Sequence, residues 1–484
     1  MPKDLQSFLQ QVRKQTGDLI EIERPVRPDD FEVTALLKQL EDRRQYPAVQ
    51  FNNPLDMYGK PSAFPLLSNM YATRERCAVM LDVDPATPNY EVSLAFKEKA
   101  AGKIKPQTIA PESAPVRENV WQGKDADVGH LPIVKHFAQD IGPVLTMTHV
   151  MRSKQGHYNA SFAKTFYKWD PHEMVVSIHT RDLSRIVKEY EIHDEPAPII
   201  NVIGHHPAFH LASLARNPWG AEDYETIGSF LGEPLRLTPS VTWGDKFMVP
   251  ADADLIIEGE IPPGQRDVCD PFGEVGRLYQ AQCLRPVFNT KAITFRHGAV
   301  LQDIFSGFRD CFALGAIPKE AAMEAALRAR FPNLHAAHSP DSSCGIHAIY
   351  ISVHNLQPGQ ADAIGKAALE AMPITECVVV VDSDIDVFHE PSVLWAVFTY
   401  ADVAHGLSVM GTGQHVVSNQ GTRLSFASTK WSGRVVVDAT RPQNAPFPPR
   451  SEVPPEVIAR VKLDDFLPKR GTVAGYANIP VGAK

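Results

Sequence analysis

The chain of 484 residues has no long apolar run and no excess of positive charge. No window approaches the roughly 18 uncharged apolar residues that a membrane-spanning helix needs, so we expect no span. The N-terminal segment is amphipathic and lacks the apolar core of a secretory signal, which indicates a cytoplasmic protein. The formal net charge of −9 and the pI of about 6.1 argue against a general nucleic-acid-binding protein.

Cysteines are few, and several common catalytic signatures are missing. The six cysteines are scattered and include no C-x-x-C pair, which in a long chain is typical of free intracellular thiols. This pattern excludes a disulfide framework and a clustered zinc site. The sequence also contains no GxxxxGK[ST] phosphate loop, no GxSxG nucleophile elbow, no HExxH zinc motif and no EF-hand loop.

Hydrophobic patterning divides the chain into three parts. Helix and strand patterns alternate over residues 1–110, which indicates an α/β domain. Over residues 111–317, short strands between Gly and Pro turns predict a β-rich barrel or sandwich. Over residues 318–484, a helix that begins at Pro318 precedes a β-α-β pattern, which predicts a second α/β domain. Further helices are expected at residues 184–190, 224–231 and 454–463.

Three polar stretches lie in apolar surroundings. Residues 159–164 (NASFAK) combine an amide, a hydroxyl and an ammonium group, although a solvated turn has the same composition. Residues 269–274 (CDPFGE) hold Pro and Gly at a tight turn, which either directs Glu274 inward or lies at the surface. Residues 382–386 (DSDID) alternate acidic side chains, which favours a solvated strand end over a divalent-cation site.

These stretches and further segments resemble the UbiD family of reversible decarboxylases. The further segments are DLQSFL at 4–9 with GDLI at 17–20, NMYATRER at 69–76, LPI at 131–133 with DIGP at 140–143, and DIDV at 384–387 with VLWA at 393–396. Each motif is short, but the motifs keep the family's order almost from end to end. The resemblance is therefore specific.

The resemblance implies an α/β (α+β multidomain) fold: an N-terminal α/β domain, a central split β-barrel flavin-binding domain and a C-terminal α/β domain. It implies prenylated FMN as the cofactor, supplied by a flavin prenyltransferase, and a homodimer or higher homo-oligomer. The implied enzyme is a carboxy-lyase. It decarboxylates an aromatic, heteroaromatic or α,β-unsaturated carboxylic acid, reversibly and without oxidation, through a covalent adduct with the prenylated flavin.

The family's catalytic set is an Arg and two Glu residues, and only one of the three is retained. The Arg position holds Lys164, which keeps the positive charge but loses the bidentate guanidinium. The first Glu position holds Cys269, and the second holds Glu274. The resemblance therefore implies Glu274 as the group that transfers the proton, and we expect Lys164 to form a coupled acid–base pair with it.

The family's cofactor-binding positions are only partly retained. They correspond to Asn159, Ser161, Phe162, Ala163, Lys164, Asp182 and Arg236. The family holds Mn²⁺ with Asn, His and Glu and a K⁺ nearby, but only Asn159 matches, since Asp182 takes the His position and Arg236 the Glu position. His179 lies three residues from Asp182. Because a cation cannot bind a cation, the presence of Mn²⁺ and K⁺ stays open.

We predict instead that Arg236, together with Lys164, neutralises the flavin phosphate, and that Arg236 pairs with Asp182 when the site is empty. The alternative is that Arg236 is a surface residue in a relict site. Ile178 and Arg181 match positions that line the family's substrate pocket. Arg181 either orients a second polar group of the substrate or faces solvent.

Three functions stay open at the level of the sequence. The first is the prenylated-FMN-dependent decarboxylase, which requires the altered catalytic set to be competent. The second is a non-catalytic or partner subunit of a larger carboxylase, and the third is a flavoprotein that uses FMN for other chemistry. The sequence does not identify the carboxylic acid.

Overall fold

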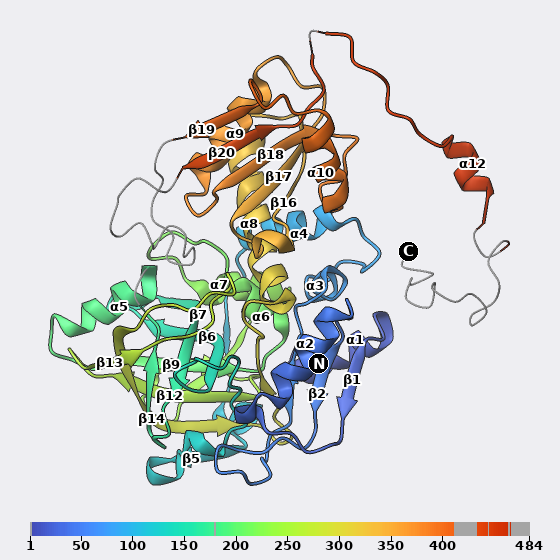
Figure 1. Ribbon diagram of the computed structural model, residues 1–484. Helices are drawn as coiled ribbons and strands as arrows, with labels where there is room; N and C mark the ends of the chain where they lie inside the picture. Colours follow the sequence, from blue (N-terminus) through green and yellow to red (C-terminus); the bar gives the residue numbers. More distant parts are fainter. Residues whose placement is uncertain (1, 179–180, 411–432, 444, 463–464, 466–484) are drawn as a thin grey trace. The chain divides into compact units, whose positions relative to one another are not determined.

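The computed structural model describes residues 2–178, 181–410, 433–443, 445–462 and 465 (Figure 1). The chain forms two compact units, Met1–Thr440 and Arg441–Lys484. In the second unit the described helix is α12 (Pro455–Arg460), which is shorter than the helix predicted over residues 454–463. Among the described residues, no helix combines the length and the apolar character that crossing a bilayer requires.

The first part of the chain builds a four-stranded sheet. β1 (Leu19–Ile22) pairs in parallel with β2 (Ala48–Phe51), and β2 pairs antiparallel with β3 (Leu66–Ser68). A distant strand, β15 (Leu301–Gln302), completes the sheet beside β3. The helices of this part are α1 (Leu5–Gln15), α2 (Glu32–Asp42), α3 (Arg74–Met80) and α4 (Asn89–Ala101). The predicted α/β class of this part is confirmed.

Six strands of the central part close into an antiparallel barrel in the described structure. The order is β12, β9, β6, β7, β8 and β14, and β14 pairs back onto β12 (Figure 1). The strands are β6 (Val144–Arg152), β7 (Tyr158–Tyr167), β8 (Glu173–Val176), β9 (Ala197–Ile203), β12 (Leu255–Ile261) and β14 (Cys283–Phe295). β14 is long enough, at 13 residues, to pair with β8 near its start and with β12 toward its end. This closure decides between the barrel and the sandwich.

Short strands and helices surround the barrel. β13 (Arg266–Cys269) pairs with the start of β14, and β5 (Asn119–Gln122) pairs with its end. A separate small sheet contains β4 (Gln107–Thr108), β10 (Arg236–Ser240) and β11 (Gly244–Pro250). The helices are α5 (Arg181–Glu191), α6 (Pro207–Ala212) and α7 (Asp223–Leu231). Because α5 begins earlier than predicted, Arg181 and Asp182 lie in its first turn.

The C-terminal part of the first unit is a five-stranded sheet with helices. Its strands, in spatial order, are β16 (Leu334–His338), β17 (Ala348–Val353), β18 (Cys377–Asp382), β20 (Arg434–Asp438) and β19 (Leu407–Met410). Its helices are α8 (Arg309–Arg328), α9 (Gln360–Ala371) and α10 (Glu390–Thr399). α9 and β18 have the predicted bounds, and the predicted α/β class is confirmed.

The predicted start of α8 is wrong. The helix begins at Arg309, and Pro318 lies inside it. A proline within a helix costs about 3 kcal/mol, because it lacks the N–H group and clashes with the preceding turn. The residues before it, Phe312, Leu314 and Ile317, are all buried, and burying such side chains offsets this cost.

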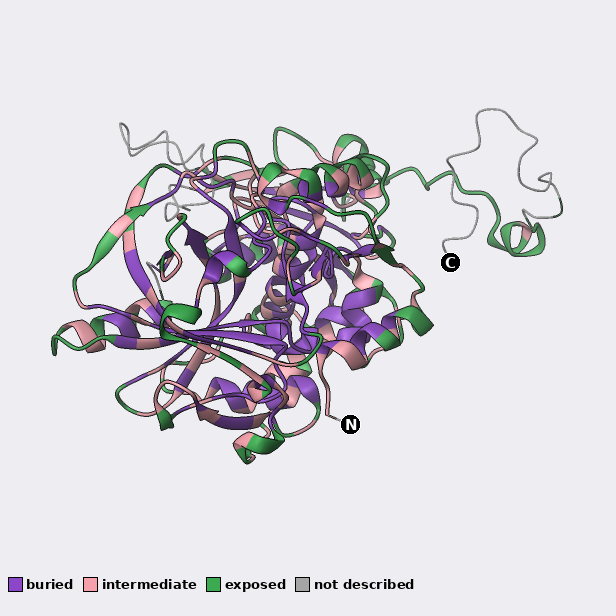
Figure 2. Ribbon diagram, turned by 90° about the horizontal axis from the view of Figure 1, so that it is seen from below, coloured by how far each residue is buried: buried purple, intermediate pink, exposed green. Residues whose placement is uncertain are grey.

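Burial follows the strands and the inner faces of the helices, and exposed residues gather in loops (Figure 2). One hydrophobic core joins α1, the first sheet, the barrel and the start of α8. Two smaller cores lie within the C-terminal part, one around α9 and one around α10. The predicted domain boundaries at residues 110 and 317 stay predictions.

Candidate functional site

Lys164 and Glu274 form an ion pair beside the barrel. Lys164 lies on β7, and its Nζ donates to Oε1 of Glu274, which lies in the turn after β13. Lys164 Nζ also lies 4.7 Å above the centroid of the Phe272 ring. The two side chains retain 17% and 16% of their exposure, so solvent screens the pair only in part. The predicted pairing of Lys164 with Glu274 is thus seen, and the alternative of a solvated turn at residues 159–164 is wrong.

The turn that carries Glu274 is held by the preceding loop at residues 137–141. Asp140 accepts the N–H of Gly273 at 2.9 Å with one carboxylate oxygen and that of Phe137 at 2.8 Å with the other. Ile141 N–H donates to the carbonyl of Pro271 at 2.8 Å. Gly273 is required here, because a Cβ atom at this position would meet the Phe137 ring at 2.2 Å. These contacts fix the backbone immediately before Glu274.

A buried histidine and aspartate lie next to this turn. His136 Nε2 lies 2.9 Å from Asp303 Oδ1, and Ser68 donates to Asp303 Oδ2 at 3.0 Å. Burial disfavours the charged imidazole, but the carboxylate of Asp303 outweighs it and raises the pKa of His136. The His136 ring lies 6.0 Å from the Phe272 ring, between centroids. His136 is therefore a further titratable group beside the Lys164–Glu274 pair.

Two cysteines border the same region. Cys269 is fully buried at the end of β13, where burial and the neighbouring Asp270 raise the pKa of its thiol. Cys311 lies in the first turn of α8, close enough that the charges of Lys164 and Glu274 act on it, and burial raises the pKa of its thiol to about 12. Both sulfurs are therefore neutral thiols at neutral pH. Cys269 supplies no charge where the UbiD resemblance implies a carboxylate.

Asn159 forms part of a second polar cluster, on the α7 side of β7. Its amide Nδ2 and the N–H of Ala160 both donate to Asp223 Oδ2 at 2.9 Å, and Asn217 donates to Oδ1 at 2.7 Å. The remaining atom, Asn159 Oδ1, is buried and has no hydrogen-bond partner among the described residues. Burial raises the pKa of Asp223, and the charge of Asp182 adds to this shift. Asp182 therefore lies close enough to Asp223 for its charge to act there, and Asp223, not Arg236, accepts the hydrogen bond of Asn159.

The prediction that Arg236 pairs with Asp182 is wrong. Arg236 forms a bidentate ion pair with Asp252, with Nε donating to Oδ2 at 2.9 Å and Nη2 donating to Oδ1. Asp252 is only 3% exposed, so this carboxylate needs the guanidinium close by. The alignment with the family's motif placed Arg236 at the same metal site as Asn159. In the structure Arg236 is the first residue of β10 and lies beside Asp252 instead.

The predicted cofactor-binding residues of β7 pair with β6 in the barrel. Ser161 lies opposite His149, Phe162 opposite Thr148, Ala163 opposite Met147 and Lys164 opposite Thr146. Ile178 is buried and Arg181 is exposed. His179 lies outside the described residues.

Arg216, which follows α6, was not anticipated from the sequence. Burial and the nearby charge of Arg181 lower its pKa. In the described part of the chain, neither Arg181 nor Arg216 has a carboxylate partner. Both arginines are exposed, so they present positive charge to which an anionic ligand can bind.

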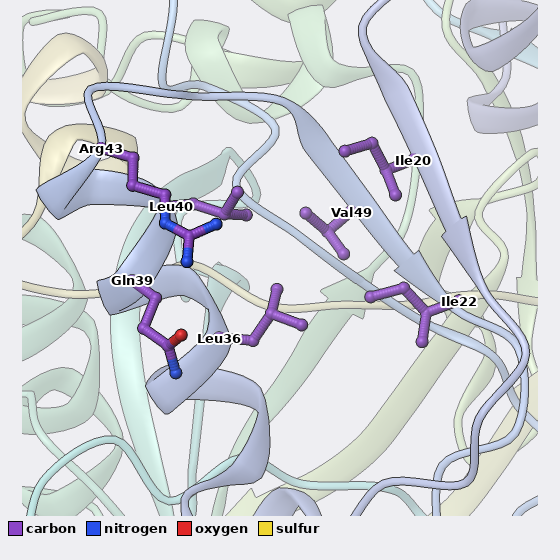
Figure 3. Close-up of a pocket in the computed structure, with 7 residues that line it drawn as sticks. All are labelled: Ile20, Ile22, Leu36, Gln39, Leu40, Arg43 and Val49. Carbon is purple, nitrogen blue, oxygen red and sulfur yellow. The ribbon is translucent and has the colours of Figure 1, made fainter. Parts of the chain in front are cut away.

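A separate pocket lies in the first part of the chain, between β1, β2 and α2 (Figure 3). It is lined by Ile20, Ile22, Leu36, Gln39, Leu40, Arg43 and Val49. None of the candidate catalytic or cofactor-binding residues lines it. Its walls are almost entirely apolar and carry no acid, so it is not a site for the chemistry of Glu274.

Several residues of the site were missed at the level of the sequence. Asp140 belongs to the DIGP motif, but only the structure shows that it holds Gly273. His136, Asp303 and Cys311 carried no spacing signal, since they meet across long stretches of chain. Asp223 directly precedes the predicted helix at 224–231, where an acidic residue is equally typical of a helix start.

Family models match three consecutive parts of the chain. Residues 11–95 match the N-terminal domain of 3-octaprenyl-4-hydroxybenzoate carboxy-lyase, residues 107–308 its Rift-related domain and residues 312–439 its C-terminal domain. Together they cover most of the chain, including Lys164, Cys269 and Glu274.

Solved structures agree with the family models. The UbiD-class enzyme HmfF from Pelotomaculum thermopropionicum, in complex with FMN, is 28% identical with a TM-score of 0.86 over 96% of this chain and 100% of that one. An evolved dimeric form of HmfF, in complex with prFMN, is 27% identical with a TM-score of 0.84 over 96% and 100%. The 3,4-dihydroxybenzoic acid decarboxylase from Enterobacter cloacae shares the fold, at 22% identity and a TM-score of 0.83 over 95% and 99%.

Barrel closure and the order of the three parts agree with these comparisons. The resemblance inferred from the sequence motifs is confirmed. The chain belongs to the UbiD family of carboxy-lyases.

Proposed function

We propose that this protein is a decarboxylase of an aromatic, heteroaromatic or α,β-unsaturated carboxylic acid, with Glu274 as the proton donor and acceptor. The observation that carries the proposal is the ion pair between Glu274 and Lys164. A carboxyl group in this position delivers its proton to the carbon that has lost CO₂. The reverse transfer serves carboxylation.

Lys164 positions Glu274 and stabilises its charged form. Once the proton of Glu274 has left, the ammonium of Lys164 lies within contact of the carboxylate oxygen that carried it. The Phe272 ring lies below the ammonium and restricts it further. Because Cys269 is a neutral thiol, Lys164 faces one carboxylate instead of two. A compact ammonium charge suits one acceptor, whereas the planar fork of a guanidinium suits bidentate pairing.

We propose prenylated FMN as the cofactor, since the UbiD-class enzyme HmfF, which is 27% identical to this chain, binds it. When bound, this group supplies an electron sink for cleavage of the carbon–carbon bond. β7, with Asn159, Ser161, Phe162 and Ala163, forms the wall of its site. The counter-charge of the phosphate falls to Arg181 and Arg216, because Arg236 and Lys164 are each committed to a carboxylate.

The described residues do not complete a metal site. Asn159 Oδ1 is a buried oxygen of the kind that Mn²⁺ binds, but the carboxylate of Asp223 beside it already accepts three N–H groups. In the described part of the chain, no group of three His, Cys, Asp or Glu side chains is arranged around a common point. We derive no step through Mn²⁺ or K⁺. A flavin prenyltransferase partner, a homo-oligomeric assembly and a cytoplasmic location remain expectations.

The test is CO₂ release from a panel of unsaturated and aromatic acids, with protein produced alongside a flavin prenyltransferase. We expect the wild type to decarboxylate at least one acid and to exchange deuterium into the decarboxylated product, at the carbon that carried the carboxyl group. Glu274→Gln keeps the shape of the site and removes the proton, so both rates should fall at least about 100-fold while flavin absorbance is unchanged. If Glu274→Gln leaves turnover untouched, the proposed role is wrong. A wild type that binds the cofactor but releases no CO₂ from any acid supports the partner-subunit alternative.

A further inference from the structure

Cys269 and Cys283 lie directly opposite one another on neighbouring strands. They are the last residue of β13 and the first residue of β14, and they are partners in the antiparallel register. Residues in such positions project to the same face and have Cα atoms about 4.5 to 5.5 Å apart. That range falls within the roughly 4.4 to 6.8 Å that a disulfide spans.

The two side chains share one apolar cluster. Cys269 is fully buried together with Phe166 and Phe272, and Cys283 packs against the same cluster from its partly exposed edge. An oxidant therefore reaches the partly exposed Cys283 more readily than the fully buried Cys269. Since burial also holds Cys269 in its thiol form, Cys283 is the sulfur that reacts first.

The pair is connected to the turn that carries Glu274. Cys283 Sγ donates to Asp270 Oδ2 at 3.2 Å, and Asp270 is the residue after Cys269. Asp270 is only 3% exposed, so its carboxylate depends on the donors around it. Four residues later the chain reaches Glu274, with Gly273 held by Asp140 in between.

We propose that Cys269 and Cys283 are a modification site: they form a reversible disulfide that acts as a clamp on the Glu274 turn. Hydrogen peroxide is the oxidant class. Cys283 gives up the proton that it shares with Asp270, and its sulfur attacks one peroxide oxygen and becomes a sulfenic acid, while the released hydroxide takes that proton and leaves as water. The sulfur of Cys269 then attacks the Cys283 sulfur, and the S–S bond forms as water leaves. Overall, two thiols lose two hydrogen atoms and the peroxide becomes two waters.

The disulfide changes the turn for a chemical reason. It consumes the S–H group that donates to Asp270, so a buried carboxylate loses a hydrogen bond. It also adds a covalent link between the end of β13 and the start of β14, which are already paired strands. The turn must adjust, and Glu274 moves relative to Lys164. Low-molecular-weight thiols reverse the change by thiol–disulfide exchange.

The experiment is peroxide treatment of the reduced full-length protein, followed by intact mass measurement and peptide mapping without reductant. The wild type should lose two hydrogen atoms and give one cross-linked pair of peptides, containing Cys269 and Cys283. Cys283→Ser should give no cross-link. The matched control is Cys377→Ser, a half-buried strand cysteine whose opposed residues are Ala348 and Val435, and this variant should behave as the wild type does.

The mapping does not depend on the flavin or on turnover, so its result stands apart from the proposed function. The proposed disulfide is wrong if peroxide cross-links any other pair of cysteines, or if Cys269 and Cys283 remain thiols after the treatment. The wild-type protein is sufficient for this test. On the active protein, oxidation should lower CO₂ release at least tenfold in the wild type and in Cys377→Ser, and dithiothreitol should restore it. Cys283→Ser should keep its activity. A Cys269–Cys283 cross-link without loss of turnover overturns the clamp.

Discussion

At the residue scale, Lys164 and Cys269 change together relative to the catalytic set that the UbiD resemblance implies. A guanidinium has donors for two carboxylates, and an ammonium beside a neutral thiol needs only one. The structure shows this reduced arrangement, with Lys164 paired to Glu274 and Cys269 buried among apolar side chains. We therefore infer that the two substitutions are coupled. An Arg at position 164 beside Cys269 would have only one carboxylate for its two pairs of donors, and a Glu at position 269 beside Lys164 would lack the guanidinium that pairs with it.

We expect Cys269→Glu alone to destabilise the protein by about 3 kcal/mol, because it introduces a buried carboxylate without a partner. Lys164→Arg in the same chain should recover part of that loss, because the guanidinium reaches both carboxylates. Urea unfolding of the wild type, the two single variants and the double variant measures the coupling. Additive effects of the two changes, within about 0.5 kcal/mol, would show that the positions are independent.

At the element scale, the loop at residues 137–141 fixes the turn that carries Glu274. Asp140 accepts two N–H groups, and one of them belongs to Gly273, the residue before Glu274. β7 supplies Lys164 from the barrel wall, so its position follows from the barrel register. The Lys164–Glu274 pair therefore depends on the loop that holds Gly273.

Asp140→Ala should lower kcat by about 10- to 100-fold with little change in KM, because Glu274 loses its alignment. It should also cost about 1–3 kcal/mol in unfolding free energy, since two buried N–H groups lose their acceptor. The matched control is Asp56→Ala. Asp56 is equally buried and accepts the N–H groups of Tyr58 and Lys60, at 3.0 and 2.9 Å, in a turn of the first part of the chain. This control should lose similar stability and keep kcat, and equal losses of kcat in both variants would contradict positioning by Asp140.

At the scale of the whole first unit, Glu320 of α8 connects its N-terminal helices to its C-terminal sheet. Its carboxylate accepts from Arg74 of α3 and Ser93 of α4, each at 2.5 Å, and lies 2.8 Å from His338 Nδ1 of β16. Burial disfavours ionisation, but Arg74 and His338 prevail and lower the pKa of Glu320 to about 2. The ion-paired carboxylate thus holds three elements from distant parts of the sequence.

Glu320→Gln should lower the unfolding free energy at pH 7 by about 3–5 kcal/mol, because Arg74 keeps a charge without its partner. Since the folded pKa lies below the unfolded value of about 4.3, this contribution is present above pH ~4 and is lost as the pH falls toward about 2. Urea unfolding at pH 7, 4 and 3 checks both the size and the sign.

The control in the same helix is Glu324→Gln. Glu324 pairs with Arg328 one turn later, and Arg328 is half-exposed, so the loss should stay near or below about 1 kcal/mol. A loss for Glu320→Gln that is no larger than for this control, or one that grows as the pH falls, would contradict the proposed role of Glu320.

The sequence by itself determined the class and order of the three parts and the family of this protein. Local patterns gave α9 and β18 with their bounds, the β-rich centre between two α/β parts, and the motif order that identified Lys164 and Glu274. These features depend on residues close together in the chain, where side-chain periodicity and turn residues act directly. The start of α8 was predicted wrongly at Pro318, because proline usually begins a helix. In the structure the burial of Phe312, Leu314 and Ile317 favours helix before the proline.

The tertiary structure decided which side chains meet. Lys164 and Glu274 are 110 residues apart, and only the closed barrel and the loop at Asp140 bring them into contact. Likewise, Arg236 pairs with Asp252 instead of Asp182, and Cys269 faces Cys283, because strand register fixes these neighbours. The physical reason is that contacts between distant segments depend on how whole elements pack. Local residue patterns do not specify which distant elements become neighbours.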